Sequence, residues 1–185
     1  MKSTLNSFVI ADANKCVGCR ACEVACFVEH NKNNNVGYTV GTVEIPAIPR
    51  LSLVKQGNFY MPIQCKHCED APCLNTCPNK AIKKENNAII VKEEACVGCK
   101  TCILACPFGA IDLLPQYKDG KKVEQIELED EKVIAYKCDL CKNSDKLACI
   151  NACPENALKL VSPIEDKKLK NKKAALALLG ISNNK

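Results

Sequence analysis

The chain has 185 residues, a length that suits one domain or two small ones. It contains sixteen cysteines, no tryptophan and only four phenylalanine and four tyrosine residues, which excludes a large aromatic core and makes bound metal the expected source of folding free energy. The formal net charge of +5 counts every cysteine as neutral. Metal-bound thiolates would reverse its sign, so the charge gives no support to a nucleic-acid-binding protein.

The cysteines are expected to bind metal rather than to form disulfides. Disulfide-rich chains are small and secreted, and they usually begin with a signal peptide. Residues 1–12 contain one lysine, no long apolar segment and no twin-arginine pair. No other segment approaches the ~18 uninterrupted apolar residues of a membrane span. We therefore expect a protein of the reducing cytoplasm without a transmembrane anchor.

The first predicted element is a strand at residues 8–11, which leads into the first cysteine run. This run has the spacing C-x2-C-x2-C-x3-C and consists of Cys16, Cys19, Cys22 and Cys26. Phe27 stands where a proline usually ends such a run, so a helix is expected to continue past it to His30. His30 could be a ligand or a proton relay, but at a helix end a capping or surface residue is the favoured interpretation.

Residues 31–62 are predicted to form a loop and then a hairpin. Residues 31–35 are rich in asparagine, which favours a loop. Residues 51–54 and 59–63 resemble two strands, with Gly57 in the turn between them. No chemistry is evident in this segment, which serves either as a partner-facing lobe or as a structural flap.

The second cysteine run has a wider loop and consists of Cys65, Cys68, Cys73 and Cys77. His67 lies inside this loop and could tune a cluster potential by hydrogen bonding to sulfur. The favoured alternative is a histidine packed on the loop with its ring bonded to the backbone. A polar turn at residues 83–87 and a strand at residues 88–91 follow.

The third run consists of Cys96, Cys99, Cys102 and Cys106, followed by Pro107. Its spacing, C-x2-C-x2-C-x3-C-P, is typical of the [4Fe–4S] clusters of bacterial ferredoxins, in which the fourth cysteine binds the other cluster of a pair. The charged segment that follows, with a turn at residues 118–121, predicts an exposed hairpin. The fourth run has a seven-residue spacer and consists of Cys138, Cys141, Cys149 and Cys153.

The order of the runs predicts two ferredoxin-like units, one inserted in the other. Runs two and three match a complete two-cluster ferredoxin, so runs one and four are the separated halves of a second one. The expected fold class is α+β, with tandem bacterial-ferredoxin-like units, small hairpins and a C-terminal helix. The predicted division is 1–30 with 132–162 for the outer unit, 31–62 for the insert, 63–112 for the inner unit, 113–131 for the exposed hairpin and 163–185 for the tail.

Exchange of the fourth cysteine within each unit assigns all sixteen cysteines to four [4Fe–4S] clusters. Set 1 is Cys16, Cys19, Cys22 and Cys153, and set 2 is Cys26, Cys138, Cys141 and Cys149. Set 3 is Cys65, Cys68, Cys73 and Cys106, and set 4 is Cys77, Cys96, Cys99 and Cys102. Zinc is disfavoured, because structural zinc sites rarely place three cysteines within seven residues.

The tail, residues 163–185, is rich in lysine, alanine and leucine, which favours a helix with a C-cap at Gly180. Leu169, Leu176 and Leu179 fall near one face of that helix. Three roles remain open for it: packing on its own domain, docking on a partner or another copy of the chain, and contact with a membrane surface.

With these runs in this order, residues 8–161 resemble the four-cluster electron-transfer subunits of the dimethyl sulfoxide reductase and formate dehydrogenase type. The segments 16–26 and 65–73 are particularly similar. The most similar members are soluble and associated with hydrogenase or formate hydrogenlyase. The resemblance implies electron relay between a molybdenum or tungsten formate dehydrogenase and a hydrogenase or another redox partner. The tail is similar to that of subunits of the hydrogen-dependent carbon dioxide reductase, which assemble into filaments.

The predicted function is therefore electron transfer without catalysis, since no histidine, serine or carboxylate constellation suggests substrate chemistry. Two alternatives remain open. One is an assembly or maturation factor for a partner metalloenzyme, and the other is a free soluble polyferredoxin that shuttles between enzymes.

Overall fold

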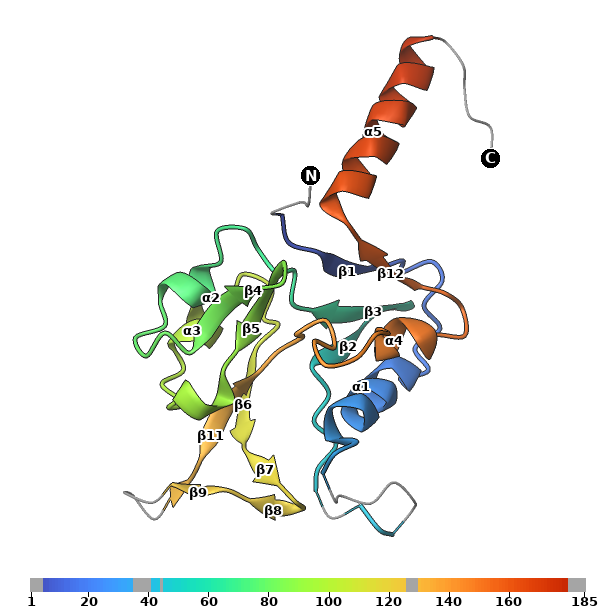
Figure 1. Cartoon of the computed structure of the whole chain (residues 1–185). Helices are drawn as coiled ribbons and strands as arrows, with labels where there is room; N and C mark the ends of the chain where they lie inside the picture. Colours follow the sequence, from blue (N-terminus) through green and yellow to red (C-terminus); the bar gives the residue numbers. More distant parts are fainter. Residues whose placement is uncertain (1–4, 35–40, 44, 126–129, 180–185) are drawn as a thin grey trace.

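Strands from near the two ends of the chain pair with each other. In the computed structural model, which describes residues 5–34, 41–43, 45–125 and 130–179, β1 (Phe8–Ala11) is antiparallel to β12 (Leu158–Val161). Two helices that contain cysteines of runs one and four, α1 (Ala21–Asn31) and α4 (Ala148–Asn151), pack against each other beside this ladder (Figure 1). The predicted strand at residues 8–11 and the predicted continuation of the helix to His30 are confirmed.

These four elements, together with the hairpin β2–β3, form what we call the outer lobe. β2 (Leu51–Gln56) and β3 (Phe59–Gln64) pair along their whole length, and Gly57 in their turn has a φ of 57°. The predicted hairpin is confirmed. β3 ends at Gln64, directly before Cys65, and so connects the outer lobe to run two.

The inner lobe contains runs two and three. Its short helices are α2 (Pro72–Asn75), the 3₁₀ helix η1 (Glu93–Ala95) and α3 (Thr101–Ala105). The hairpin of β4 (Ile82–Glu85) and β5 (Ala88–Val91) turns at Asn86 and Asn87. Both asparagines have positive φ, as a tight two-residue turn between right-twisted strands requires.

A second ladder closes the inner lobe. β6 (Asp112–Pro115) pairs with β11 (Val133–Tyr136), which leads into run four. The predicted inner unit ends at residue 112, but β6 begins there and continues into the segment that follows. Beyond this ladder the chain extends as the small strands β7 (Tyr117–Lys118), β8 (Lys121–Lys122), β9 (Glu124–Gln125) and β10 (Asp130–Glu131), and the predicted turn at residues 118–121 is confirmed by the β7–β8 pairing.

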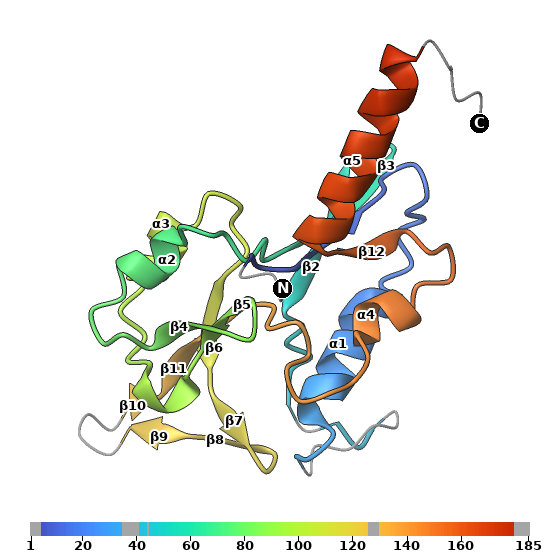
Figure 2. The same cartoon turned by 45° about the horizontal axis from the view of Figure 1, so that its top comes forward.

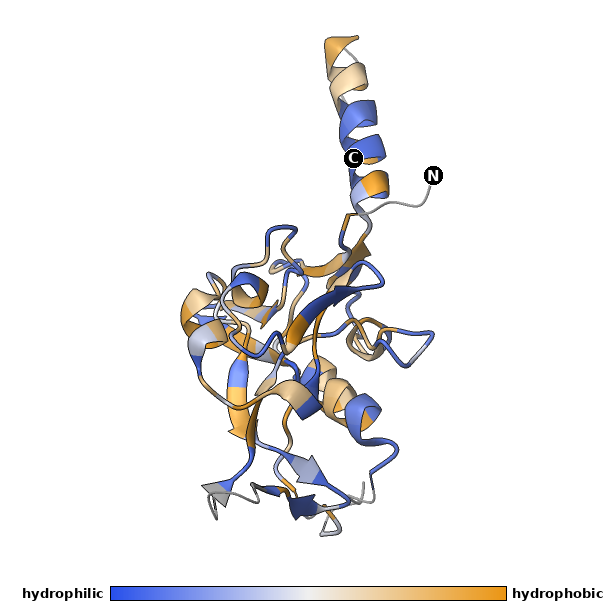
Figure 3. Ribbon diagram, turned by 60° about the vertical axis from the view of Figure 1, so that its left-hand side comes forward, coloured by the Kyte–Doolittle hydropathy of each residue, from blue (hydrophilic) through white to orange (hydrophobic). Residues whose placement is uncertain are grey.

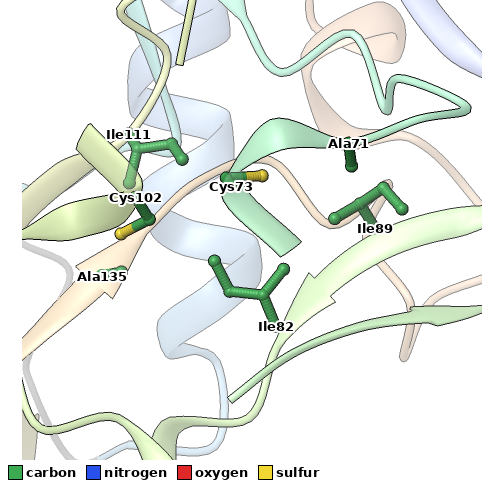
Figure 4. Packing of buried hydrophobic residues seen from close by; sticks show 7 residues of the cluster. All are labelled: Ala71, Cys73, Ile82, Ile89, Cys102, Ile111 and Ala135. Carbon is green, nitrogen blue, oxygen red and sulfur yellow. The ribbon is translucent and has the colours of Figure 1, made fainter. Parts of the chain in front are cut away.

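Each lobe has its own core of aliphatic residues and cysteines. The core of the inner lobe consists of Ala71, Cys73, Ile82, Ile89, Cys102, Ile111 and Ala135 (Figure 4). The core of the outer lobe consists of Val9, Cys22, Cys26, Leu51, Cys149 and Leu158. Neither core contains an aromatic residue, in agreement with the composition of the chain.

The predicted tail helix is confirmed as α5 (Pro163–Leu178), which projects away from both lobes (Figures 1 and 2). It contains no buried residue within the part of the chain that the structure describes, so it does not pack on its own domain. The ribbon coloured by residue hydropathy is mostly hydrophilic in the middle of α5 and includes hydrophobic residues toward both ends (Figure 3). The predicted C-cap at Gly180 lies outside the described residues. Among the described helices, none is long and apolar enough to cross a membrane.

Candidate metal centres

The sixteen cysteines are all free thiols, and the fold divides them between the two lobes by run. Runs one and four contribute Cys22, Cys26 and Cys149 to the outer core, with Cys153 packed against it. Runs two and three contribute Cys73 and Cys102 to the inner core, with Cys68, Cys77, Cys96 and Cys106 packed against it. Cys19 and Cys99 are the exposed members.

One cavity in each lobe is lined by four cysteines. In the outer lobe these are Cys16, Cys19, Cys22 and Cys153, which are the four residues of set 1. In the inner lobe they are Cys77, Cys96, Cys99 and Cys102, which are the four residues of set 4. The structure thus brings together, in each cavity, cysteines that the spacing assigned to one cluster.

A pair of facing strand residues closes each cavity. Leu53 and Pro62, opposite each other in the β2–β3 hairpin, line the outer cavity. Leu113 and Ala135, opposite each other in the β6–β11 ladder, line the inner cavity. The hairpin at residues 51–64 therefore covers the cysteines as a structural flap, which is one of the two roles expected for this segment.

The cysteines of sets 2 and 3 lie close enough to affect one another electrostatically. Burial raises the pKa of the Cys149 thiol to about 12, and the charges of Cys26 and Cys141 contribute in the same direction. Burial also raises the pKa of Cys73 to about 11, and Cys65 and Cys106 contribute in the same direction. Four such thiols become thiolates together only beside a positive metal core, so metal binding must release their protons.

Backbone N–H groups point at the sulfur of the last cysteine of each run. In runs two, three and four the N–H four residues later donates: Ala81 to Cys77 at 3.3 Å, Ala110 to Cys106 at 3.5 Å and Ala157 to Cys153 at 3.3 Å. In run one, which lacks the proline, α1 continues through the equivalent position, and the Arg50 amide donates to Cys26 at 3.3 Å instead. Such bonds stabilise thiolates and tune cluster potentials.

His67 is buried, and the N–H of Ile89 donates to its Nδ1 at 2.9 Å. The favoured interpretation, a histidine with its ring bonded to the backbone, is confirmed. Burial lowers the pKa of His67 to about 3, so the ring is neutral and carries its proton on Nε2.

The expected capping role of His30 is confirmed at the end of α1, but its side chain is mostly buried and not on the surface. Its Nδ1 donates to the Cys26 carbonyl at 2.8 Å, and its Nε2 donates to Asp139 at 2.9 Å. Burial lowers the pKa of His30, but the bonds to Asp139 and Cys26 outweigh it and raise the pKa to about 9. The pairing of His30 with Asp139, which lies 109 residues away, was not predicted.

Asp139 lies at the centre of a buried network beside set 2. It accepts hydrogen bonds from Arg50 Nη1 at 2.9 Å and from the Cys141 amide at 3.0 Å, in addition to the bond from His30. Burial would raise the pKa of Asp139, but these partners lower it well below its usual range. The network fixes the loop between Cys138 and Cys141 against the end of α1.

The residues present fit [4Fe–4S] clusters. Within the described chain, no three His, Cys, Asp or Glu side chains converge as the ligands of a single ion would, whereas in a cubane cluster each cysteine binds a different iron atom. The buried Gln64 amide and His67 Nε2 have no hydrogen-bond partner among the described residues. Buried donors of this kind suit a group rich in sulfur acceptors.

Comparison with known proteins gives two family matches and several curated relatives. Models of the 4Fe-4S dicluster domain match residues 57–162 and residues 15–82. The electron transport protein HydN of Escherichia coli is 42% identical over 156 residues, which cover 83% of this chain and 87% of HydN. Formate hydrogenlyase subunit 2 of Escherichia coli is 33% identical over 192 residues, which cover 93% of this chain and 90% of that subunit.

Proposed function

Because the chain belongs to the 4Fe-4S dicluster family of iron–sulfur electron-transfer proteins, we propose that it relays electrons through four [4Fe–4S] clusters within a formate dehydrogenase- or hydrogenase-type complex. It is an electron carrier and not a catalytic subunit. The observation that carries the number four is the pair of cavities lined by sets 1 and 4, one in each lobe, because each lobe then retains four further cysteines for a second cluster.

The ligands proposed for the clusters are sets 1 to 4, in two nested ferredoxin-like units. The β1–β12 pairing supports this arrangement, because it places runs one and four in a single lobe. When bound, the clusters supply one-electron oxidation and reduction. The chain's own residues hold them, donate hydrogen bonds to their cysteine ligands and exclude water from them.

The four ligand sets follow one another through the molecule. Sets 1 and 2 meet at Cys22 and Cys26 on α1, one helical turn or ~6 Å apart along the axis. Sets 3 and 4 meet at Cys102 on α3 and at Cys106, which directly follows that helix. Sets 2 and 3 meet between the lobes, where the charge of Cys65 acts on Cys138. The exposed Cys19 and Cys99 then mark the two ends of the relay.

The proposed partners are the catalytic subunit of a molybdenum or tungsten formate dehydrogenase, a hydrogenase subunit, or both. The likeness to formate hydrogenlyase subunit 2 supports this choice. We also propose a cytoplasmic location and docking of α5 on another copy of the chain or a related four-cluster subunit. The exposure of Leu169 and Leu178 supports this docking. If each copy docks on the next, the chains assemble into a filament.

The test is anaerobic iron and sulfide analysis of the purified protein, with EPR of the dithionite-reduced form. The proposal expects about sixteen iron atoms per chain and spectra broadened by interacting clusters. About eight iron atoms would contradict the pairing of runs one and four. Co-purification with a large catalytic subunit would indicate a fixed relay subunit, and its absence a free polyferredoxin. If the chain binds only the metal-free form of the catalytic subunit, it is an assembly factor.

A further inference from the structure

Two lysines cross the boundary between the lobes, each beside a cysteine. Lys66 follows Cys65 in the inner lobe, and its Nζ donates to the Val9 carbonyl of β1 in the outer lobe at 3.1 Å. Lys137 precedes Cys138, and its Nζ donates to the Ile89 carbonyl of β5 in the inner lobe and to the Cys138 carbonyl at 2.8 Å. Lys66 thus connects the inner lobe to β1 of the outer lobe, and Lys137 connects the start of run four to β5 of the inner lobe.

Lys137 is 2% exposed, which is rare for a lysine without an acidic partner. In the described parts of the chain, neither Lys137 nor Lys66 forms an ion pair with a carboxylate. Carbonyl oxygens satisfy the hydrogen bonds of Lys137 but do not neutralise its charge. Burying an uncompensated charge is costly, so a negative group is expected nearby.

The nearby negative groups are the ligands of sets 2 and 3. Lys137 directly precedes Cys138 of set 2, and Ile89, whose carbonyl it contacts, packs with Cys73 of set 3 in the inner core. Lys66 directly follows Cys65 of set 3, and Val9, whose carbonyl it contacts, packs with Cys26 and Cys149 of set 2 in the outer core. Both lysines therefore lie where sets 2 and 3 approach each other.

We propose that Lys137, assisted by Lys66, raises the reduction potentials of the clusters held by sets 2 and 3 relative to those at the two ends. A cluster with four thiolates gains one negative charge on reduction, and a fixed positive charge in a poorly hydrated site stabilises that added electron. The junction between the lobes then holds electrons more strongly than the termini do. The proposal rests on the proposed function, because it requires sets 2 and 3 to carry clusters.

The experiment is an EPR-monitored redox titration of the anaerobically purified full chain and its Lys137→Gln variant. Glutamine keeps a hydrogen-bond donor but removes the charge. Two of the four midpoint potentials should fall by ~59 mV each. This shift corresponds to about a tenfold decrease in the equilibrium constant for one-electron reduction. The matched control is Lys83→Gln, which removes an exposed lysine of β4 and should leave all four potentials unchanged.

Iron content separates this proposal from the proposed function. Fewer than about sixteen iron atoms in the unmodified chain would contradict four clusters, whatever the potentials are. A Lys137→Gln variant with full iron content and four unchanged potentials would overturn the role of the lysine alone. If that variant does not retain its iron, Lys66→Gln is titrated in the same way. A fall of two potentials then supports the proposal, and four unchanged values overturn it.

Discussion

Gly18 lies against the ring of Tyr60 so closely that a Cβ built on the glycine would be 2.6 Å from a ring carbon. Gly98, the equivalent residue of run three, lies against the backbone of Val133, with 2.7 Å from such a Cβ to the carbonyl oxygen. Both glycines have positive φ, of 74° and 67°. Tyr60 belongs to β3 and Val133 to β11, so the strands that close the two cavities also contact the glycines of the cysteine loops.

Alanine at these glycines should damage the two lobes unequally. Both substitutions cost about 1–2 kcal/mol for the left-handed backbone, but the Tyr60 ring can rotate away, whereas the Val133 carbonyl is fixed by its ladder. We expect Gly98→Ala to lose more iron and more thermal stability than Gly18→Ala, and Tyr60→Ala to restore part of the loss in Gly18→Ala. Gly109→Ala is the control, because its φ is also positive and a Cβ there meets nothing within 4 Å.

Single cysteine substitutions should reveal how the runs share clusters. Under the proposed ligand sets, Cys19→Ala and Cys153→Ala each remove about four iron atoms and abolish the same EPR signal, although the two residues belong to different runs. Cys149→Ala, in the same run as Cys153, should abolish a different signal. If Cys149→Ala and Cys153→Ala abolish one and the same signal, exchange of the fourth cysteine is wrong.

Removal of Asp139 should destabilise the outer lobe. The Asp139→Ala substitution leaves His30 buried without its carboxylate and leaves Arg50 with Glu93 as its remaining ion-pair partner, a change that costs about 3–5 kcal/mol. Thermal unfolding of the iron-loaded protein should show a clear fall in midpoint. Glu85→Ala breaks only the exposed ion pair with Lys92, which is worth about 0–1 kcal/mol, and it serves as the control. Equal midpoints for the two variants would show that the Asp139 network contributes little to stability.

Loss of iron should unfold both lobes. Cysteines make up a large part of the two cores, and neither of these cores contains an aromatic residue. Metal-binding free energy is then folding free energy. We expect anaerobic chelation to abolish the cooperative thermal transition and to leave amide hydrogens unprotected in both lobes. A cooperative transition that survives complete iron removal would contradict this view of the cores.

Truncation before Pro163 should leave the clusters intact. α5 has no buried residue among those described, so its removal exposes no core and should not change the iron content. If α5 docks on another copy of the chain, truncation should reduce the particle size measured by light scattering. An unchanged size, with iron retained, would rule out self-association through α5.

The sequence was sufficient to predict the local elements of this fold. The cysteine spacing, the missing proline at Phe27 and the apolar segment at residues 8–11 each act over a few residues, and the strand and the extended helix follow from them. The same holds for the Gly57 hairpin. Local pattern predicts the extended helix and the Gly57 hairpin because neighbouring residues supply most of their hydrogen bonds. The apolar segment at residues 8–11 predicts a strand, but its partner, β12, is far away in the sequence and could not be predicted from that segment.

The contacts between distant segments could not be predicted in this way. In run one the backbone N–H four residues after Cys26 belongs to α1 and does not bind the Cys26 sulfur. The Arg50 amide binds that sulfur instead, and nothing in the sequence near Cys26 indicates which segment provides this donor. Likewise, β6 and β11 pair across the charged segment between them. A signal did exist at Asp139: an acidic residue inside a cysteine loop that becomes buried must find cationic partners.

The pairing of β1 with β12 has a consequence for biosynthesis. The ribosome makes β1 and run one first, but the inner lobe is completed before the outer lobe, because its last core residue, Ala135, precedes run four. The outer lobe must wait for β12, so β1 remains without its partner strand while about 150 residues are added, a delay of roughly 8–30 s at typical rates of synthesis. During this interval the first thiols are open to oxidation and to the wrong metals. Correct loading of the nascent chain therefore depends on how quickly its final strand arrives.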